Sequence, residues 1–219
     1  MSATDPRPLT GEPFSLDLLN TRWHDRHGSH DLLCSVTGLA LWLARSRAAE
    51  SYGRGELRAD RATLAAARAA RSVLAGVVGR PAAGPAALDA FNRLLEAGRT
   101  RRLLTEAGPV ERLEIADPAG LLGYLAAADY LRLLAAAPDR VRRCADPSCG
   151  LRFHDVSRNG TRRWCTSTGC GNRAKAARHY ARRTAGGPAA PSAPAGVAGP
   201  VDPGGPARPT AGRTERSPV

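Results

Sequence analysis

The chain has 219 residues and a formal net charge of +12, from 32 Lys and Arg against 20 Asp and Glu. This length is enough for one sizeable domain and a small module. The first residues form no apolar run and no stretch of about eighteen uninterrupted apolar residues occurs, so we expect neither a secretory signal nor a transmembrane helix and infer a cytoplasmic protein.

Both ends of the chain are predicted to be disordered. Residues 1–12 are polar and contain proline. Residues 185–219 contain eight prolines and seven glycines, with almost no large apolar side chains. Such a composition buries too little surface to offset the entropy of ordering. We therefore place the folded part between residues 13 and 184.

Residues 13–138 are predicted to form a mainly helical domain. The apolar segment 14–21 favours a helix or turn, and the polar segment 23–31 is interpreted as a loop. Two β-compatible runs flank Ala107-Gly108-Pro109 and predict a hairpin. Apolar residues at helical spacing predict four further helices. These are a helix through Leu39, Trp42 and Leu43 with Thr37 as its cap, a helix over 59–78 that ends at Gly79, a helix over 85–97, and a helix from Pro118 to Pro138 with Leu122, Leu125 and Tyr130 on its apolar face.

Residues 139–184 are predicted to form a separate module. Two β-rich runs, 152–157 and 161–165, flank Asn159-Gly160, which is a strong hairpin signal because both residue types tolerate a positive φ. A helix is expected over residues 172–184, and Gly186-Gly187 is expected to end it. The order of cysteine knuckle, hairpin, second cysteine pair and helix is typical of a treble-clef-like module. The whole fold is predicted to be α+β.

Four cysteines carry the strongest chemical signal in the chain. Cys144 and Cys149 are separated by four residues, as are Cys165 and Cys170, and glycine follows each pair. Four thiolates in two short clusters can complete a tetrahedral zinc site that has no open position. Disulfides or an iron–sulfur centre are the alternatives, but a cytoplasmic protein with paired cysteines favours a metal. We predict one Zn²⁺ per chain, and we expect the fifth cysteine, Cys34, to be a small buried apolar residue.

The excess positive charge is concentrated on the cysteine module. Residues 140–184 contain 12 basic and 2 acidic side chains, a net charge of +10, whereas residues 1–139 contain 17 and 16. Four thiolates with one Zn²⁺ lower the module to about +8. A dense positive charge on a compact metal module indicates nucleic acid, with a merely solvated face as the alternative.

The predicted terminal helix has two different faces. At about 100° per residue, Lys175, Arg178 and Arg182 fall within about 60° of one another, and we expect them to contact nucleic acid. The hairpin is expected to add contacts from Arg158, Arg162 and Arg163. The opposite face is expected to pack inward. Arg173 lies on this face, and we expect it to hydrogen-bond knuckle carbonyls or Asp155. Asn172 is expected to cap the helix or to donate to a cysteine sulfur. The inward-facing set is completed by Ala176, Ala177, Tyr180 and Ala181.

The module resembles the CGNR zinc-finger family, which is named for the motif found here at residues 170–173. The four cysteines, Asp155, Ser157-Arg158-Asn159, Arg163-Trp164 and Lys175 fit its pattern, while Ser167 stands where a methionine is expected. The N-terminal part is similar to the ABATE-type domain at LDLLNT (16–21), Asp31-Leu32-Leu33 and the helix through Trp42. The resemblance implies a bacterial, stress-induced transcription regulator.

Two functional hypotheses follow, and a third is disfavoured. The first is a DNA-binding regulator whose N-terminal domain senses a signal or dimerises. The second is an RNA-binding or protein-docking module, in which Trp164 and Phe153 stack on bases, although a role in the small core of the finger is favoured. An enzyme is not expected, since His24, His27 and His30 lack helical metal-ligand spacing and fit a polar loop equally well. The sequence leaves open a homodimer and a small ligand of the N-terminal domain. Asn20 and Arg22 could line a pocket for it, although a role in a turn is favoured.

Overall fold

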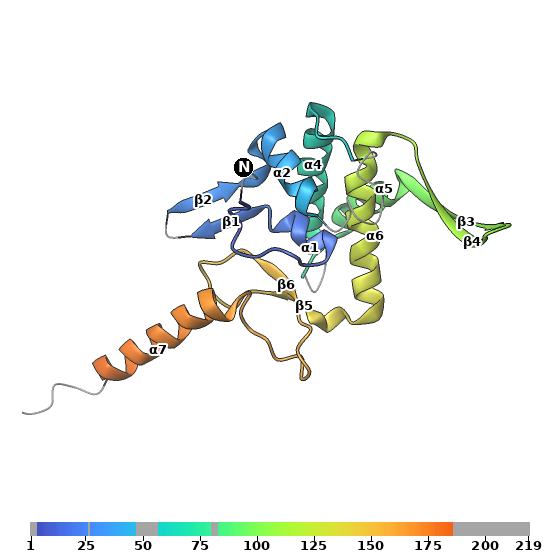
Figure 1. Cartoon of the computed structure of the whole chain (residues 1–219). Coiled ribbons are helices and arrows are strands. Elements are labelled where there is room, and N and C mark those ends of the chain that lie inside the picture. The colour runs from blue at the N-terminus through green and yellow to red at the C-terminus, as the bar shows by residue number, and fades with distance from the viewer. Residues whose placement is uncertain (1–3, 26, 47–56, 80–82, 186–219) are drawn as a thin grey trace, which may run out of the picture.

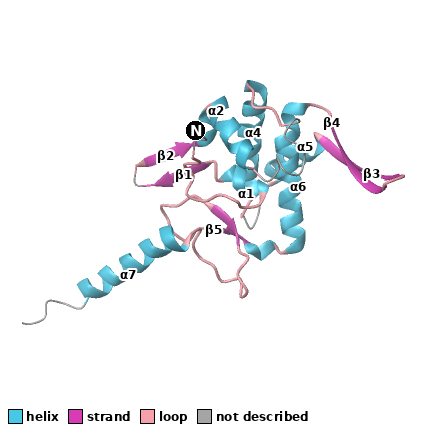
Figure 2. Ribbon diagram, viewed as in Figure 1, coloured by secondary structure: helices cyan, strands magenta, loops and turns pink. Residues whose placement is uncertain are grey.

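The computed structural model describes residues 4–25, 27–46, 57–79 and 83–185. The tail predicted to be disordered lies outside these residues, apart from Ala185. A bundle of helices forms the body, three two-stranded antiparallel sheets surround it, and one helix projects from the far end (Figures 1 and 2). The predicted α+β class is confirmed.

The helical body is built around its most apolar helix, α6. It contacts α1, α4 and α5, and its buried side chains occupy nearly its whole circumference. By length and composition, residues 118–136 would suffice to cross a membrane, but half of this stretch is buried inside the fold by the neighbouring helices. The helices of the body are α1 (Phe14–Leu19), α2 (Val36–Arg45), α4 (Arg61–Val77), α5 (Pro85–Glu96) and α6 (Leu121–Ala136).

The start of α2 differs from the prediction. Ser35 and not Thr37 caps the helix, since the Ser35 side chain accepts a hydrogen bond of 3.1 Å from the Gly38 amide. The helix therefore begins one residue before Thr37. Gly38 permits this start because a Cβ there would collide with the Leu32 carbonyl oxygen.

The polar segment after α1 is a hairpin and not the predicted loop. Strand β1 (Arg22–Asp25) pairs with β2 (Gly28–Asp31), and Gly28 has a φ of 123° at the start of β2. The Trp23 ring stacks on the opposite His30 ring at 5.0 Å. Cross-strand pairing thus stabilises strands that the polar sequence did not indicate.

The predicted hairpin at Gly108 is confirmed, and it is long. Strands β3 (Gly98–Thr105) and β4 (Gly108–Ile115) pair along their whole length. Their outer part extends away from the helices (Figure 1). At the base, Leu113 and Ile115 pack with Tyr124 of α6.

The N-terminal segment is ordered from residue 4, so the prediction of disorder over 1–12 is wrong for its described part. Arg7 is buried and pairs with Asp5 at 2.8 Å and with Asp17 at 3.0 Å. Leu9 joins the hydrophobic core. Two fixed side chains therefore hold a segment whose composition is typical of a loop.

The strands of the cysteine module also differ from the prediction. Strand β5 (Val141–Arg143) pairs with β6 (Arg152–His154), and residues 161–165 form no strand. The turn at Gly160 exists, with a φ of 61°. Its loop is closed by the Asp155 side chain, which accepts hydrogen bonds from the backbone amides of Ser157 and Arg162. These bonds take the place of the expected strand pairing.

Candidate metal centre and basic surface

The four paired cysteines meet at one point. Their Sγ atoms all lie within 4.8 Å of one another, and all four side chains are buried. The Sγ atoms of Cys149 and Cys165 are 3.8 Å apart, and those of Cys165 and Cys170 are 3.5 Å apart. A zinc tetrathiolate with Zn–S bonds of about 2.3 Å has S–S edges of about 3.8 Å. The arrangement therefore fits a closed tetrahedral zinc site.

Four thiolates this close together require a cation. Hydrogen bonding from Cys165 lowers the pKa of Cys149 to about 5, whereas the neighbouring Cys149 raises the pKa of Cys165, and burial raises that of Cys170 to about 12. Without a metal, the cluster therefore favours one thiolate, and ionisation of further cysteines is unfavourable. A divalent metal compensates the remaining thiolates, which is why the donor set fits Zn²⁺.

Arg173 holds the second cysteine pair against the first. Its guanidinium donates to Sγ of Cys170 at 2.9 Å and to Asp146 Oδ2 at 2.8 Å. Hydrogen bonds from Ser148, with Arg173 also contributing, lower the pKa of Asp146 to about 2. Arg173 therefore contacts the metal cluster as its predicted structural role requires, but the expected partners, Asp155 and the knuckle carbonyls, are wrong. A sequence search for an acidic residue between the first two cysteines would have found Asp146.

The other predicted supporting residues have separate positions. Asp155 is buried, and it accepts hydrogen bonds from Ser157 Oγ at 2.6 Å and from the Arg162 amide at 2.9 Å. These bonds, with Ser157 as the largest cause, lower the pKa of the Asp155 carboxyl. Asn172 is exposed at the first residue of α7 (Asn172–Ala185) and does not cap it. One turn of π-helix precedes α7, and the Thr166 side chain caps that turn instead.

The module is docked onto the helical body by a residue whose role the sequence analysis missed. Asn20, just after α1, donates to the Arg152 carbonyl at 2.8 Å and accepts from the Arg152 amide at 2.9 Å. Its side chain is almost fully buried and thus pairs with the edge of β6 as a strand would. Beside it, Glu12 accepts from the His154 amide at 2.7 Å. Asn20 therefore serves to dock the module, and its only sequence signal was an amide next to an apolar run.

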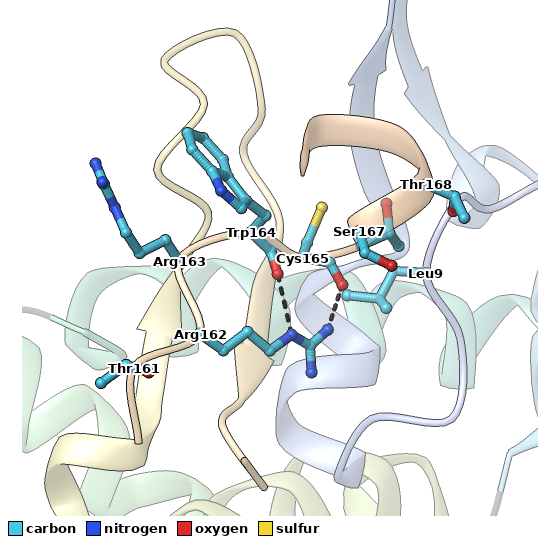
Figure 3. Close-up of a pocket in the computed structure, with 9 residues that line it drawn as sticks. Leu9, Thr161, Arg162, Arg163, Trp164, Cys165, Ser167 and Thr168 are labelled. Carbon is cyan, nitrogen blue, oxygen red and sulfur yellow. Dashed lines mark hydrogen bonds between the residues drawn. The ribbon is translucent and has the colours of Figure 1, made fainter. Parts of the chain in front are cut away.

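The arginines of the loop before the third cysteine fall into two groups. The Arg162 guanidinium lies 4.3 Å above the Phe153 ring and donates to the carbonyls of Trp164 and Cys165. It points beneath Cys165 toward Leu9 in a cavity of about 670 Å³ (Figure 3). Arg162 is therefore removed from the predicted contact residues and assigned to packing. Arg158 and Arg163 remain exposed.

Phe153 and Trp164, the two aromatic residues considered for base stacking, also differ in how far they are buried. Phe153 is fully buried in the core, as favoured by the sequence analysis. Trp164 is only half-buried, and the Arg163 guanidinium lies 5.4 Å from the centre of its ring. Figure 3 shows Trp164 and Arg163 pointing to the side away from Leu9.

Helix α7 stands free of the body, so its predicted inward face is wrong. In the described part of the chain it projects from the module with contacts only at its start (Figure 1), and Tyr180 on the supposed inner face is 69% exposed. Lys175, Arg178 and Arg182 are exposed, and the described residues give them no ion pair. The helix contains five basic residues and no acidic one. Periodicity alone could not distinguish an alanine-rich buried face from an unpartnered one.

The remaining candidates lie apart from the metal cluster. His30 pairs with Asp25 at 2.9 Å on the exposed β1–β2 hairpin, while His24, His27 and His30 form no metal-holding group within the described residues. Cys34 is exposed, which corrects the prediction that it is buried. It is the last residue of a short 3₁₀ turn, Leu32–Cys34, in which Leu32 and Leu33 are buried in the core.

The fold and the cysteine cluster define a zinc-finger protein in which the finger is attached to a helical domain. A family model described as "CGNR zinc finger" matches residues 140–183, and a second, ABATE, described as "Putative stress-induced transcription regulator", matches residues 12–137. The second match covers more than half of the chain, so the chain belongs to the ABATE family. A comparison with curated proteins gives no match. The protein binds one zinc ion, and its family and finger indicate a regulator of transcription.

Proposed function

We propose that the protein regulates transcription by binding double-stranded DNA through the basic face of α7, while its N-terminal domain senses a signal or dimerises. The main support for this proposal is that α7 projects into solvent with Lys175, Arg178 and Arg182 exposed along one stripe. A free cationic helix is of the right width to enter the major groove of DNA. Such a protein acts in the cytoplasm on the chromosome, and stress is the signal that the family description supports.

We further propose that the zinc has a structural role and that the protein is not an enzyme. Four cysteine sulfurs fill the tetrahedral shell, which leaves no position for water or substrate. The metal instead holds the second cysteine pair and the first turn of α7 against the knuckle. An RNA-binding or protein-docking module is the second candidate, and the half-buried Trp164 beside Arg163 favours it.

The test is binding to duplex DNA selected from a random pool, measured over a series of salt concentrations with and without zinc. If the stripe neutralises phosphates, replacing Lys175, Arg178 and Arg182 with Ala should weaken binding and reduce the log–log salt slope by about two to three units. The matched control replaces Arg58, Arg61 and Arg93, which are exposed on the N-terminal domain and carry the same charge.

Two outcomes would contradict the proposal. An unchanged salt slope in the α7 variant would show that the helix is not the contact surface. An equal change in the control variant would show that net charge, and not the position of the charges, drives binding. Tighter binding to single-stranded RNA than to any selected duplex would favour the second candidate.

A further inference from the structure

The β3–β4 hairpin is an arm that the body only partly supports. Its eight-residue strands reach about 27 Å at about 3.4 Å per residue. Among the described residues, only the base of the arm is supported, where Leu113 and Ile115 pack on α6 and the Thr100 hydroxyl lies 3.2 Å from the Tyr124 hydroxyl. An isolated two-stranded ribbon is marginally stable in water. The outer half of the arm therefore requires a partner.

The tip of the arm is apolar on both faces. Leu104 pairs across the strands with Pro109, and the next pair, Leu103 with Val110, faces the opposite side because side chains alternate along a strand. Leu104 is 85% exposed and Val110 is 38% exposed. Exposing apolar side chains on both faces of a projecting tip is unfavourable in water, so such a tip indicates an interaction site.

The charges of the arm favour a protein partner over a nucleic acid. Below the tip, Arg99 and Arg101 pair with Glu114, and Arg102 pairs with Glu111. The arm contains four arginines, counting Arg112, and three glutamates, so its net charge is only +1, and three of the arginines are ion-paired within the arm; it therefore offers little excess charge to phosphates. The first 139 residues are nearly neutral as a whole, while the zinc module is strongly basic. Two copies can thus approach through their N-terminal domains with the least repulsion.

The same half of the molecule carries a surface for the tip. Six large apolar side chains are exposed in the described residues, and four of them lie on the arm or on the helices joined to it. Two are Leu104 and Val110 at the tip, and the other two are Leu88 on α5 and Leu131 on α6. An apolar tip and exposed leucines on α5 and α6 of one chain are what a two-fold dimer of this kind needs, because each copy then provides both halves of the contact.

We propose that the β3–β4 arm of each chain docks its apolar tip on α5 and α6 of a second copy. The proposal gives the dimerising role in the proposed function a specific surface, and it rests on that part alone.

The experiment measures the mass of the full-length zinc-bound protein by light scattering across a concentration series. Leu104→Glu with Val110→Glu alters the tip, and Leu88→Glu with Leu131→Glu alters the proposed receiving surface. Because each dimer loses either both tips or both receiving surfaces, we expect either variant to associate at least about a hundredfold more weakly than the unaltered protein. All four positions are exposed, so circular dichroism and zinc content should stay unchanged.

The matched control is Val156→Glu, which makes the same change at a side chain that is 78% exposed on the zinc module. It should associate as the unaltered protein does. A monomeric unaltered protein, or a tip variant that stays dimeric, would overturn the proposal. If the protein is monomeric and the tip variant loses affinity for duplex DNA, the arm inserts into DNA instead. These results are independent of the α7 salt slope, which tests DNA binding separately.

Discussion

Asn20 makes the contact that joins the zinc module to the helical body, and replacing it with Ala should destabilise the whole protein. Its side chain exchanges two hydrogen bonds, of 2.8 and 2.9 Å, with the Arg152 backbone. Each such bond contributes about 1 kcal/mol, and a buried backbone group left without a partner costs about 1–3 kcal/mol. Because Ala removes both hydrogen bonds to the Arg152 backbone, we expect a loss of about 3 kcal/mol in the free energy of unfolding.

Thermal unfolding followed by far-UV circular dichroism, with zinc in excess, measures this loss. For a chain of this size about 3 kcal/mol corresponds to a decrease in Tm of roughly 6–12 °C. Release of zinc to a chelator should also become faster, because the module is held less firmly. Asn159→Ala is the control, since Asn159 is exposed on the loop of the module. Equal melting of the two variants would refute the argument that Asn20 replaces a strand at the edge of β6.

Four further predictions can be tested on the same protein. Cys170→Ser should lower the zinc content measured by elemental analysis from one per chain to a substoichiometric value, whereas Cys34→Ser should leave it at one. Removal of zinc by a chelator should abolish the structure of about residues 139–184 but keep most of the helical signal, and a complete loss of that signal would contradict the division into domain and module. Arg173→Ala should speed zinc release because it removes the hydrogen bond to Cys170, while Arg178→Ala should not. A thiol reagent should label only Cys34 in the native zinc-bound protein and all five cysteines after chelation, and rapid labelling of more than one thiol before chelation would contradict the closed site.

The sequence by itself determined the features that depend on near neighbours in the chain. The cysteine spacing predicted the zinc cluster because two short knuckles can each present two thiolates to one ion. Helical periodicity located α4, α5 and α6, and glycine beside proline at residues 108–109 located the long hairpin. The polar β1–β2 hairpin was missed because cross-strand pairs, and not the alternation of apolar residues, stabilise it.

Only the tertiary structure decided which distant segments meet. Val141 pairs with His154 although the expected partner strand was at residues 161–165, and Asn20 binds a residue that is 132 positions away. Composition predicted disorder over residues 1–12, yet the buried ion pairs of Arg7 fix the described part of this segment. The apolar face of α7 has the periodicity of a packed helix, but the body offers it no surface. Such pairings depend on the shape and hydrogen-bonding groups that the remainder of the fold presents, which no local pattern encodes.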